Sequence, residues 1–228
     1  MISNRKTAII VGILFIVGTV AGVLSVLFTG SILDDPDYLT KVASNQNQII
    51  MGVLLVLMMG FALSMVPVMM FPIFRKHNEV LALAAIVFRG VLEAVTYIAI
   101  AISWLLLLTL SREYIKAGAP DASYFQTLGT ILLKTDDWIA QILAIVFSLG
   151  ALAIYYLFYQ SKLIPRWLST WGLIGAVLYL AAPLLAMFGF VLEILMAPLA
   201  LQEMVLALWL IVKGLNSSEN TSGAAKQI

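Results

Sequence analysis

Six long apolar runs constrain this chain more than any other feature of its sequence. Several reach the roughly 20 apolar residues that a helix needs to cross the hydrocarbon core of a bilayer. The chain is 62% hydrophobic and only 11% charged, whereas a soluble domain carries about 25% charged residues. The runs are continuous and do not alternate with polar residues, which excludes a transmembrane β-barrel. The sequence therefore predicts an all-α membrane protein that lies in the lipid bilayer.

The expected architecture is a single domain, residues 1–214, built as a bundle of six transmembrane helices. A short interfacial helix is expected within residues 38–48, and residues 111–134 are expected to form the longest loop. The polar, small residues 215–228 predict a disordered tail. The six spans are expected at residues 7–30, 49–74, 79–110, 135–160, 169–190 and 193–213.

Two short motifs predict where helices begin. Asp136 and Asp137 precede an apolar run, and carboxylates are favourable at a helix N-terminus, so we expect them to cap the fourth span. Pro165 cannot continue the fourth helix, so residues 165–172 are expected to form an interfacial turn. Ser169 is the expected N-cap of the fifth span.

The loop cations predict how the bundle is oriented. Cytoplasmic loops of membrane proteins carry an excess of Lys and Arg. The richer side has the shorter loops, so both termini, and the tail, are expected in the cytoplasm of a multi-pass protein of the cell membrane. That side holds Arg5, Lys6, Arg75, Lys76, Lys162, Arg166, Lys213 and Lys226, and the other side holds Lys41, Arg112, Lys116 and Lys134.

Three charged residues fall inside the apolar runs. Arg89 lies about 15 Å along the third span at 1.5 Å per residue, and Glu93 follows on the same helix face. Glu203 lies in the middle of the sixth span, at a similar depth. Charges within spans usually face the bundle interior, and an arginine has more donors than one carboxylate can satisfy. We therefore expect Arg89 to contact Glu93, Glu203 or both.

Two interpretations of this cluster remain open. Its charges sum to −1, and an excess carboxylate at low dielectric tends to bind a proton or a cation. The cluster could thus bind a proton or a small polar or amphipathic ligand, in a transport-like or sensing protein. Alternatively, it is a packing clamp in a non-catalytic structural or interaction protein. The polar side chains expected to line a ligand site are Thr96, Ser103, Gln141, Ser148 and Gln202.

Other signals narrow the function classes. The net charge of +1 gives no reason to expect a nucleic-acid partner, and the chain has no cysteine. The sequence contains none of the common hydrolase or nucleotide-binding motifs, so it favours a protein that is not an enzyme and needs no metal or cofactor. Gly18 and Gly22 form a G-x-x-x-G pattern that permits close helix approach. The pattern leaves the oligomeric state open, since it fits a contact within one chain or between two.

Several segments together resemble a bacterial and archaeal membrane family catalogued as domain of unknown function 4386. The resemblance covers nearly the whole chain, and residues 165–172 are its most specific part. It implies a small integral membrane protein and carries over no catalytic residue, cofactor or substrate. The matching residues are Tyr38-Leu39 with Asn45, Phe88-Arg89 with Glu93, Leu163-Ile164-Pro165-Arg166-Trp167-Leu168-Ser169 with Trp171-Gly172, and Glu203 with Leu208-Trp209-Leu210 and Lys213-Gly214.

Overall fold

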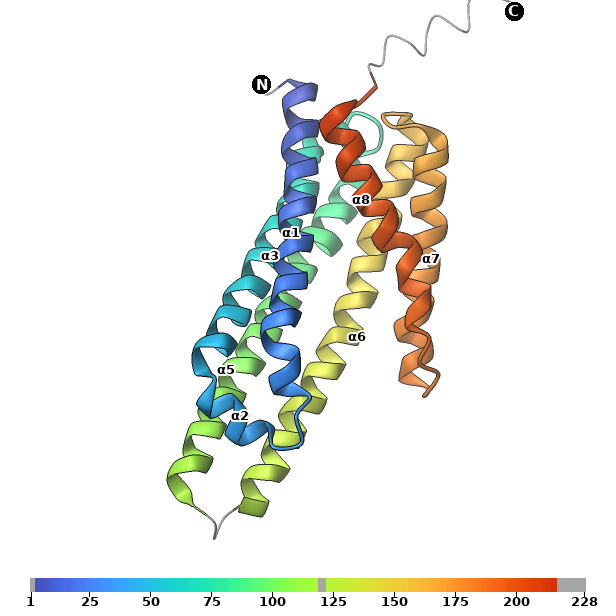
Figure 1. Ribbon diagram of the computed structural model, residues 1–228. Coiled ribbons are helices and arrows are strands. Elements are labelled where there is room, and N and C mark those ends of the chain that lie inside the picture. The colour runs from blue at the N-terminus through green and yellow to red at the C-terminus, as the bar shows by residue number, and fades with distance from the viewer. Residues whose placement is uncertain (1–2, 119–121, 217–228) are drawn as a thin grey trace, which may run out of the picture.

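The computed structural model describes residues 3–118 and 122–216, and within these ranges it is an all-helical bundle (Figure 1). Six helical segments of the described chain are long and apolar enough to cross a membrane, which confirms the predicted fold class. The helices are α1 (Asn4–Leu33), α2 (Tyr38–Ser44), α3 (Gln46–Phe74), α4 (Glu79–Ala85), the π-helix η1 (Ile86–Leu92), α5 (Glu93–Ala117), α6 (Ala122–Ser161), α7 (Arg166–Met187), the 3-10 helix η3 (Glu193–Met196) and α8 (Ala197–Val212).

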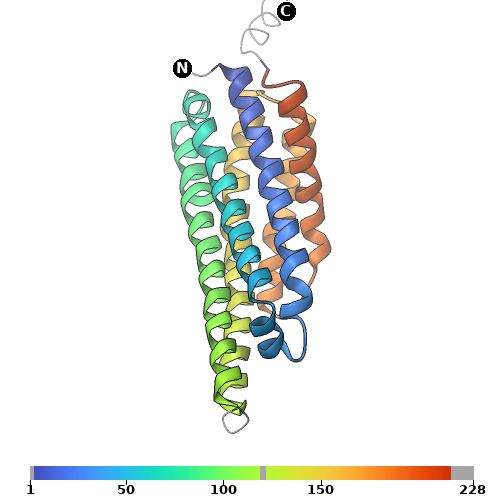
Figure 2. The ribbon, with the colours of Figure 1, turned by 60° about the vertical axis from the view of Figure 1, so that its left-hand side comes forward.

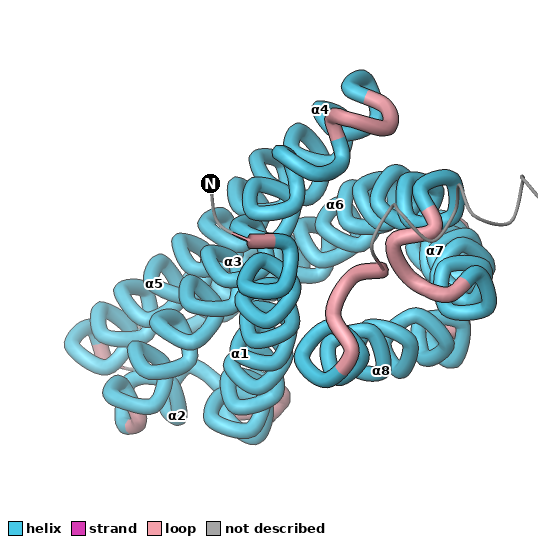
Figure 3. The backbone as a smooth tube through the Cα atoms, turned by 90° about the horizontal axis from the view of Figure 1, so that it is seen from above, coloured by secondary structure: helices cyan, strands magenta, loops and turns pink. Residues whose placement is uncertain are grey.

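The six spans form a closed ring in chain order. Each span packs against the spans before and after it, and α8 closes the ring by packing against α1. Seen from above, α6, α7 and α8 lie on one side of α1, and α3 and α5 lie on the other (Figure 3). Both ends of the described chain lie at the same end of the bundle, which we call the terminal end (Figure 1). The orientation of this end in a membrane stays a prediction.

The third and fourth spans extend far beyond the others and correct the predicted loop of residues 111–134. Helix α5 continues to Ala117 and α6 begins at Ala122, so the described part of this segment is almost entirely helical. At about 1.5 Å per residue, the 40 residues of α6 reach about 60 Å, twice the bilayer core. Figure 2 shows this α5–α6 hairpin projecting past the rest of the bundle, at what we call the hairpin end.

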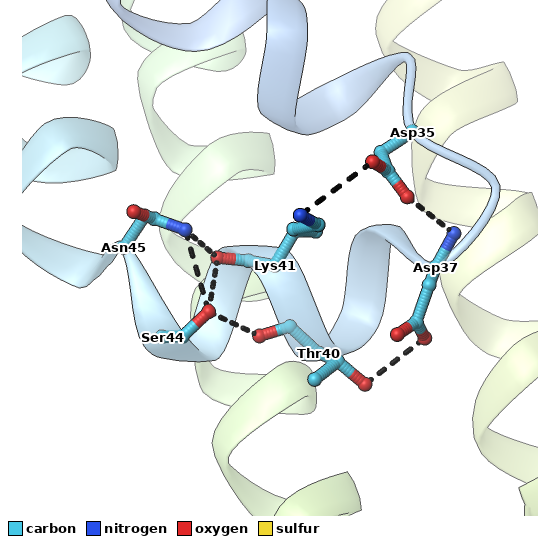
Figure 4. A network of polar contacts seen from close by, with 6 residues as sticks. All are labelled: Asp35, Asp37, Thr40, Lys41, Ser44 and Asn45. Carbon is cyan, nitrogen blue, oxygen red and sulfur yellow. Dashed lines mark hydrogen bonds and ion pairs between the residues drawn. The ribbon is translucent and has the colours of Figure 1, made fainter.

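The short helix expected within residues 38–48 exists as α2, at the hairpin end (Figure 1). Asp35 accepts a hydrogen bond from the backbone N–H of Asp37 at 2.8 Å, and Asp37 accepts one from the Thr40 hydroxyl at 2.9 Å. Lys41 lies 4.0 Å from Asp35, and Asn45 donates to the Lys41 carbonyl at 2.9 Å (Figure 4). These contacts connect the turn after α1 to the whole length of α2, so the acidic residues have a local structural role.

Two predicted helix starts are wrong. Asp136 and Asp137 lie inside α6, because that helix begins 14 residues earlier, at Ala122. The turn before α7 ends at Pro165, which is the N-cap, so residues 166–172 are helical. Ser169 sits in the first turn and its hydroxyl donates to the Arg166 carbonyl at 3.0 Å. Proline suits the first turn of a helix because its missing N–H would have no helical partner there.

At the terminal end, α1 contacts α8 through a side-chain cap and a close helix crossing. Arg5 donates to the carbonyls of Ile211 at 2.7 Å and Val212 at 3.1 Å, and so caps the C-terminus of α8. A Cβ at Gly12 would lie 2.6 Å from the Ala207 carbonyl oxygen, so α1 and α8 cross in close contact there. The first residues of the predicted tail are also held, because Asn216 donates to the Lys162 carbonyl at 2.9 Å. Residues 217–228 of that tail lie outside the described residues.

The G-x-x-x-G pattern of α1 forms a contact within the chain, between α1 and α3. A Cβ at Gly18 would lie 2.7 Å from the side chain of Leu63, and one at Gly22 would lie 2.5 Å from the sulfur of Met59. Both contacted residues belong to α3, so the small residues let α1 and α3 approach closely.

Candidate functional site

A π-helix in the middle of the third span presents Arg89. In η1 the backbone N–H of Glu93 bonds to the Phe88 carbonyl, five residues back, which widens the helix by one residue. A Cβ at Gly150 of α6 would lie 2.8 Å from the backbone nitrogen of Arg89. Glycine at this position therefore permits the widened turn to touch the α6 backbone. Such π-helical bulges occur frequently at functional sites.

Arg89 joins both acidic residues, as expected. Its Nη2 lies 2.9 Å from Oε1 of Glu203, and its Nε lies 3.6 Å from Oε2 of Glu93. The guanidinium carbon also lies 4.1 Å from the centre of the Phe147 ring and 5.8 Å from that of Phe15. The side chains of Arg89 and Glu93 are each only 1% exposed. The cation is thus held between two carboxylates and two aromatic rings, inside the ring of helices.

The π-helix also changes which residues of α5 share a face with Arg89. In an uninterrupted α-helix Thr96, seven residues on, would return to the face of Arg89. The extra residue in η1 shifts this register by one, and the structure buries Tyr97 and leaves Thr96 half-buried. The Thr96 hydroxyl donates to the Glu93 carbonyl of its own helix at 2.8 Å. A Cβ at Gly60 would lie 2.8 Å from Cβ of Tyr97, so α3 leaves room for the tyrosine.

A cavity of about 700 Å³ lies beside this cluster, between α1, α3, α5, α6, α7 and η3–α8. Its lining is mostly apolar, and it extends from Glu203 toward the hairpin end. Glu203 is 8% exposed and is the member of the cluster that lines the cavity. The side chains with polar groups in the lining are Thr19, Ser25, Tyr97, Trp104, Asp136, Gln141, Tyr179 and Glu203.

The predicted polar lining is distributed unevenly around the molecule. Gln141 lines the cavity. Ser103 donates weakly to the Leu132 carbonyl at 3.5 Å, and Ser148 donates to the Ala144 carbonyl of its own helix at 2.6 Å. Gln202 points away toward α7, where it donates to the Leu168 carbonyl at 3.0 Å. These side chains satisfy backbone groups, which is the ordinary role of buried polar residues.

Asp136 is the most informative residue that the sequence did not assign to the site. It lines the cavity from α6, and its Oδ2 accepts a hydrogen bond from Nε1 of Trp104 at 3.1 Å. In the sequence, Asp136 is a carboxylate beside an apolar run, at the expected start of the fourth span. That position predicted a helix cap, whereas α6 begins at Ala122. Within the described residues, no group of three His, Cys, Asp or Glu side chains could hold a metal ion.

Comparison with known proteins agrees with the resemblance noted in the sequence. No curated protein and no solved structure matches the chain. One family profile does match, over residues 10–214, and it is described as Domain of unknown function (DUF4386). The match includes most of the first span, all of the other five, the residues Arg89, Glu93 and Glu203, and the lining of the cavity. The chain therefore belongs to the family of Domain of unknown function (DUF4386).

Proposed function

We propose that this protein binds a small amphipathic ligand in the cavity beside Glu203, as part of a transport-like or sensing role in the cell membrane. One observation carries the proposal: Glu203 touches both the buried Arg89 and the cavity. Ligand at the cavity can therefore affect the charge cluster directly, through a single side chain. A proton on a carboxylate of the cluster is the alternative way to balance its excess negative charge.

The size and chemistry of the cavity support binding. Small-molecule sites typically enclose about 300–1,000 Å³, with mostly apolar walls and a few placed polar groups. The cavity of about 700 Å³ has this composition, with Glu203, Gln141 and Asp136 as its strongly polar groups. A ligand with an apolar body and one polar group would match it.

The position of the cavity supports access from the lipid phase. Val23, Val26 and Leu27 of α1 and Ala200 of α8 line the cavity, and each is exposed. Helices α1 and α8 cross closely at Gly12 and separate toward the hairpin end (Figure 1). An opening rimmed by exposed apolar side chains within two spans faces hydrocarbon, so an amphipathic molecule could enter sideways.

A packing clamp is the second candidate function of the cluster, and the burial of Arg89 and Glu93 favours it. Both side chains are 1% exposed, and the cavity lining includes neither. The two proposals are compatible if Arg89 and Glu93 hold the helices together while Glu203 serves the cavity. If the clamp is the whole function, Glu93→Gln will lower stability and ligand binding will not occur.

A cavity-blocking variant tests the binding proposal. Ala140 lines the cavity with an exposed side chain, so Ala140→Trp should fill the space without disturbing the core. Ile142 is 48% exposed and lies outside the lining, so Ile142→Trp is the matched control. Binding of phenylbutylamine, phenylbutanol and phenylbutyrate would be measured by calorimetry on protein in lipid nanodiscs, with empty nanodiscs subtracted.

The proposal predicts that at least one of these probes binds the wild type and the Ile142→Trp variant, and that Ala140→Trp weakens its binding at least about tenfold. Failure of all three probes to bind, or equal binding by Ala140→Trp and wild type, would contradict the proposal.

A further inference from the structure

We propose that the ligand is an organic cation, a protonated amine on an apolar body, and that Asp136 and Trp104 bind its ammonium group. This inference rests on the proposed function and names the substrate class of the same cavity. It also assigns a second carboxylate, far from the Arg89 cluster, as the group that selects the ligand's charge.

Asp136 has one carboxylate oxygen that no protein group satisfies. Oδ2 accepts from Trp104, but Oδ1 is buried and has no hydrogen-bond partner among the described residues. The cation nearest in sequence, Lys134, lies 3.3 Å from Asp137. Among the described ion pairs, none includes Asp136. Buried polar atoms are almost always paired, with protein or with ordered water, and an ammonium group in the cavity would supply a donor to this carboxylate.

The remaining polar atoms of the cavity point to the same chemistry. Oε1 of Gln141 is also buried without a partner within the described chain, and Glu203 offers carboxylate oxygens. The described lining contains no Lys, Arg or His side chain. A ligand carboxylate or phosphate would meet two carboxylates and no cation there, whereas an ammonium group supplies the missing donors and the missing positive charge.

Aromatic side chains add a second source of attraction for a cation. The lining includes Tyr97, Trp104, Phe147 and Tyr179. A cation within about 6 Å of the centre of such a ring is attracted to its face, most strongly to that of tryptophan. The Phe147 ring already contacts Arg89, whose guanidinium carbon lies 4.1 Å from the centre of the ring. Trp104 is held beside Asp136 by its own hydrogen bond, so its ring and the carboxylate form one site.

The two carboxylates of the cavity are not equivalent. Glu203 already lies 2.9 Å from a guanidinium nitrogen of Arg89. Asp136 lies on α6 about 21 Å from Gly150, the residue that touches Arg89, at 1.5 Å per residue. The ammonium group therefore belongs at Asp136, nearer the hairpin end, and the apolar body extends toward Glu203.

The test compares Asp136→Asn with Asp137→Asn. Both changes remove one carboxylate from the same turn of α6, but Asp137 is exposed and lies outside the cavity lining. The probes are phenylbutylamine, phenylbutanol and phenylbutyrate, which share an apolar body and differ in charge. Their dissociation constants would be measured by calorimetry in nanodiscs at neutral pH, and the folded state of each variant would be checked by its thermal melting.

The inference predicts that wild type binds the amine at least about tenfold more tightly than the alcohol, and binds the carboxylate least. Asp136→Asn should remove that preference, Asp136→Glu should retain most of it, and Asp137→Asn should leave it unchanged. Trp104→Phe should weaken the amine and spare the alcohol.

Equal binding of amine and alcohol by the wild type, blocked by Ala140→Trp, would overturn this inference and leave the proposed function standing. The same holds if Asp136→Asn keeps the preference for the amine. The wild-type comparison decides the matter even if Asp136→Asn does not fold. Binding of no probe at all would contradict both proposals.

Discussion

Replacing Arg89 with methionine should destabilise the protein by removing the one cation that two buried carboxylates share. Methionine fills a similar volume and adapts to irregular spaces, so the loss of packing is small. The carboxylate of Glu93 is fully buried and that of Glu203 nearly so. Breaking a buried pair by removing one partner costs about 3–5 kcal/mol, because a buried charge is left uncompensated. We expect a loss of about 3–5 kcal/mol in the free energy of unfolding.

The triple variant Arg89→Met, Glu93→Gln, Glu203→Gln separates charge from packing. It keeps the shape of the cluster and removes all three charges. Replacing a whole buried ion cluster by well-packed hydrophobic residues of similar volume is often neutral or stabilising, and a neutral Gln amide costs less to bury than an uncompensated carboxylate. The triple variant should therefore recover most of the stability that Arg89→Met loses.

Reversible unfolding in mixed micelles, followed by circular dichroism, would give the free energies of unfolding. Arg112→Met is a suitable control, because Arg112 is exposed and its hydrogen bond to Gln46 lies at the surface. A free energy of unfolding for Arg89→Met within about 1 kcal/mol of the wild-type value would contradict this prediction. The prediction also fails if the triple variant is as unstable as the single one.

The packing and the topology support three further predictions. Gly150→Ala should lower the free energy of unfolding by about 1–3 kcal/mol, because the new Cβ meets the backbone of Arg89. In the same unfolding assay Gly30→Ala should be neutral or stabilising, because its new Cβ meets only ordinary contacts at 3.8 Å and beyond. Arg5→Met should cost about 1 kcal/mol by removing the cap of α8; equal melting temperatures would show that the cap adds no stability. Reporter fusions should place Gly118 outside the cell and the C-terminus inside, and a periplasmic reporter active at the C-terminus would reverse the predicted orientation.

The spans and the charge cluster could be predicted from the sequence for physical reasons. A run of apolar residues long enough to cross the bilayer favours a helix of that length, and the described residues contain six helices long and apolar enough to do so. A charge inside such a run must find partners in the bundle, which is why Arg89, Glu93 and Glu203 meet. The sequence did not predict the full length of α5 and α6, because hydropathy marks only the apolar part of a helix. Polar residues such as Arg112 and Gln126 continue the helices beyond it.

The details of the site depend on packing that the sequence does not display. The π-helix exists where Gly150 lets two backbones touch, and this one-residue widening replaces Thr96 by Tyr97 on the buried face. The cavity exists because α1 and α8 are joined at one end and separate at the other. Asp136 lines the cavity from inside α6, whose start at Ala122 hydropathy does not mark. Each of these features is a relation between helices distant in sequence.

We propose that the cavity between Asp136 and Glu203 holds an amphipathic ligand. The most direct test is a density map of the protein determined in lipid, at a resolution that separates side chains from bound molecules. We predict an elongated density that does not belong to the protein, with its polar end within hydrogen-bonding distance of Asp136 and its body against Phe147 and Tyr179. A map in which α1 and α8 close together and protein side chains fill the space would contradict the claim.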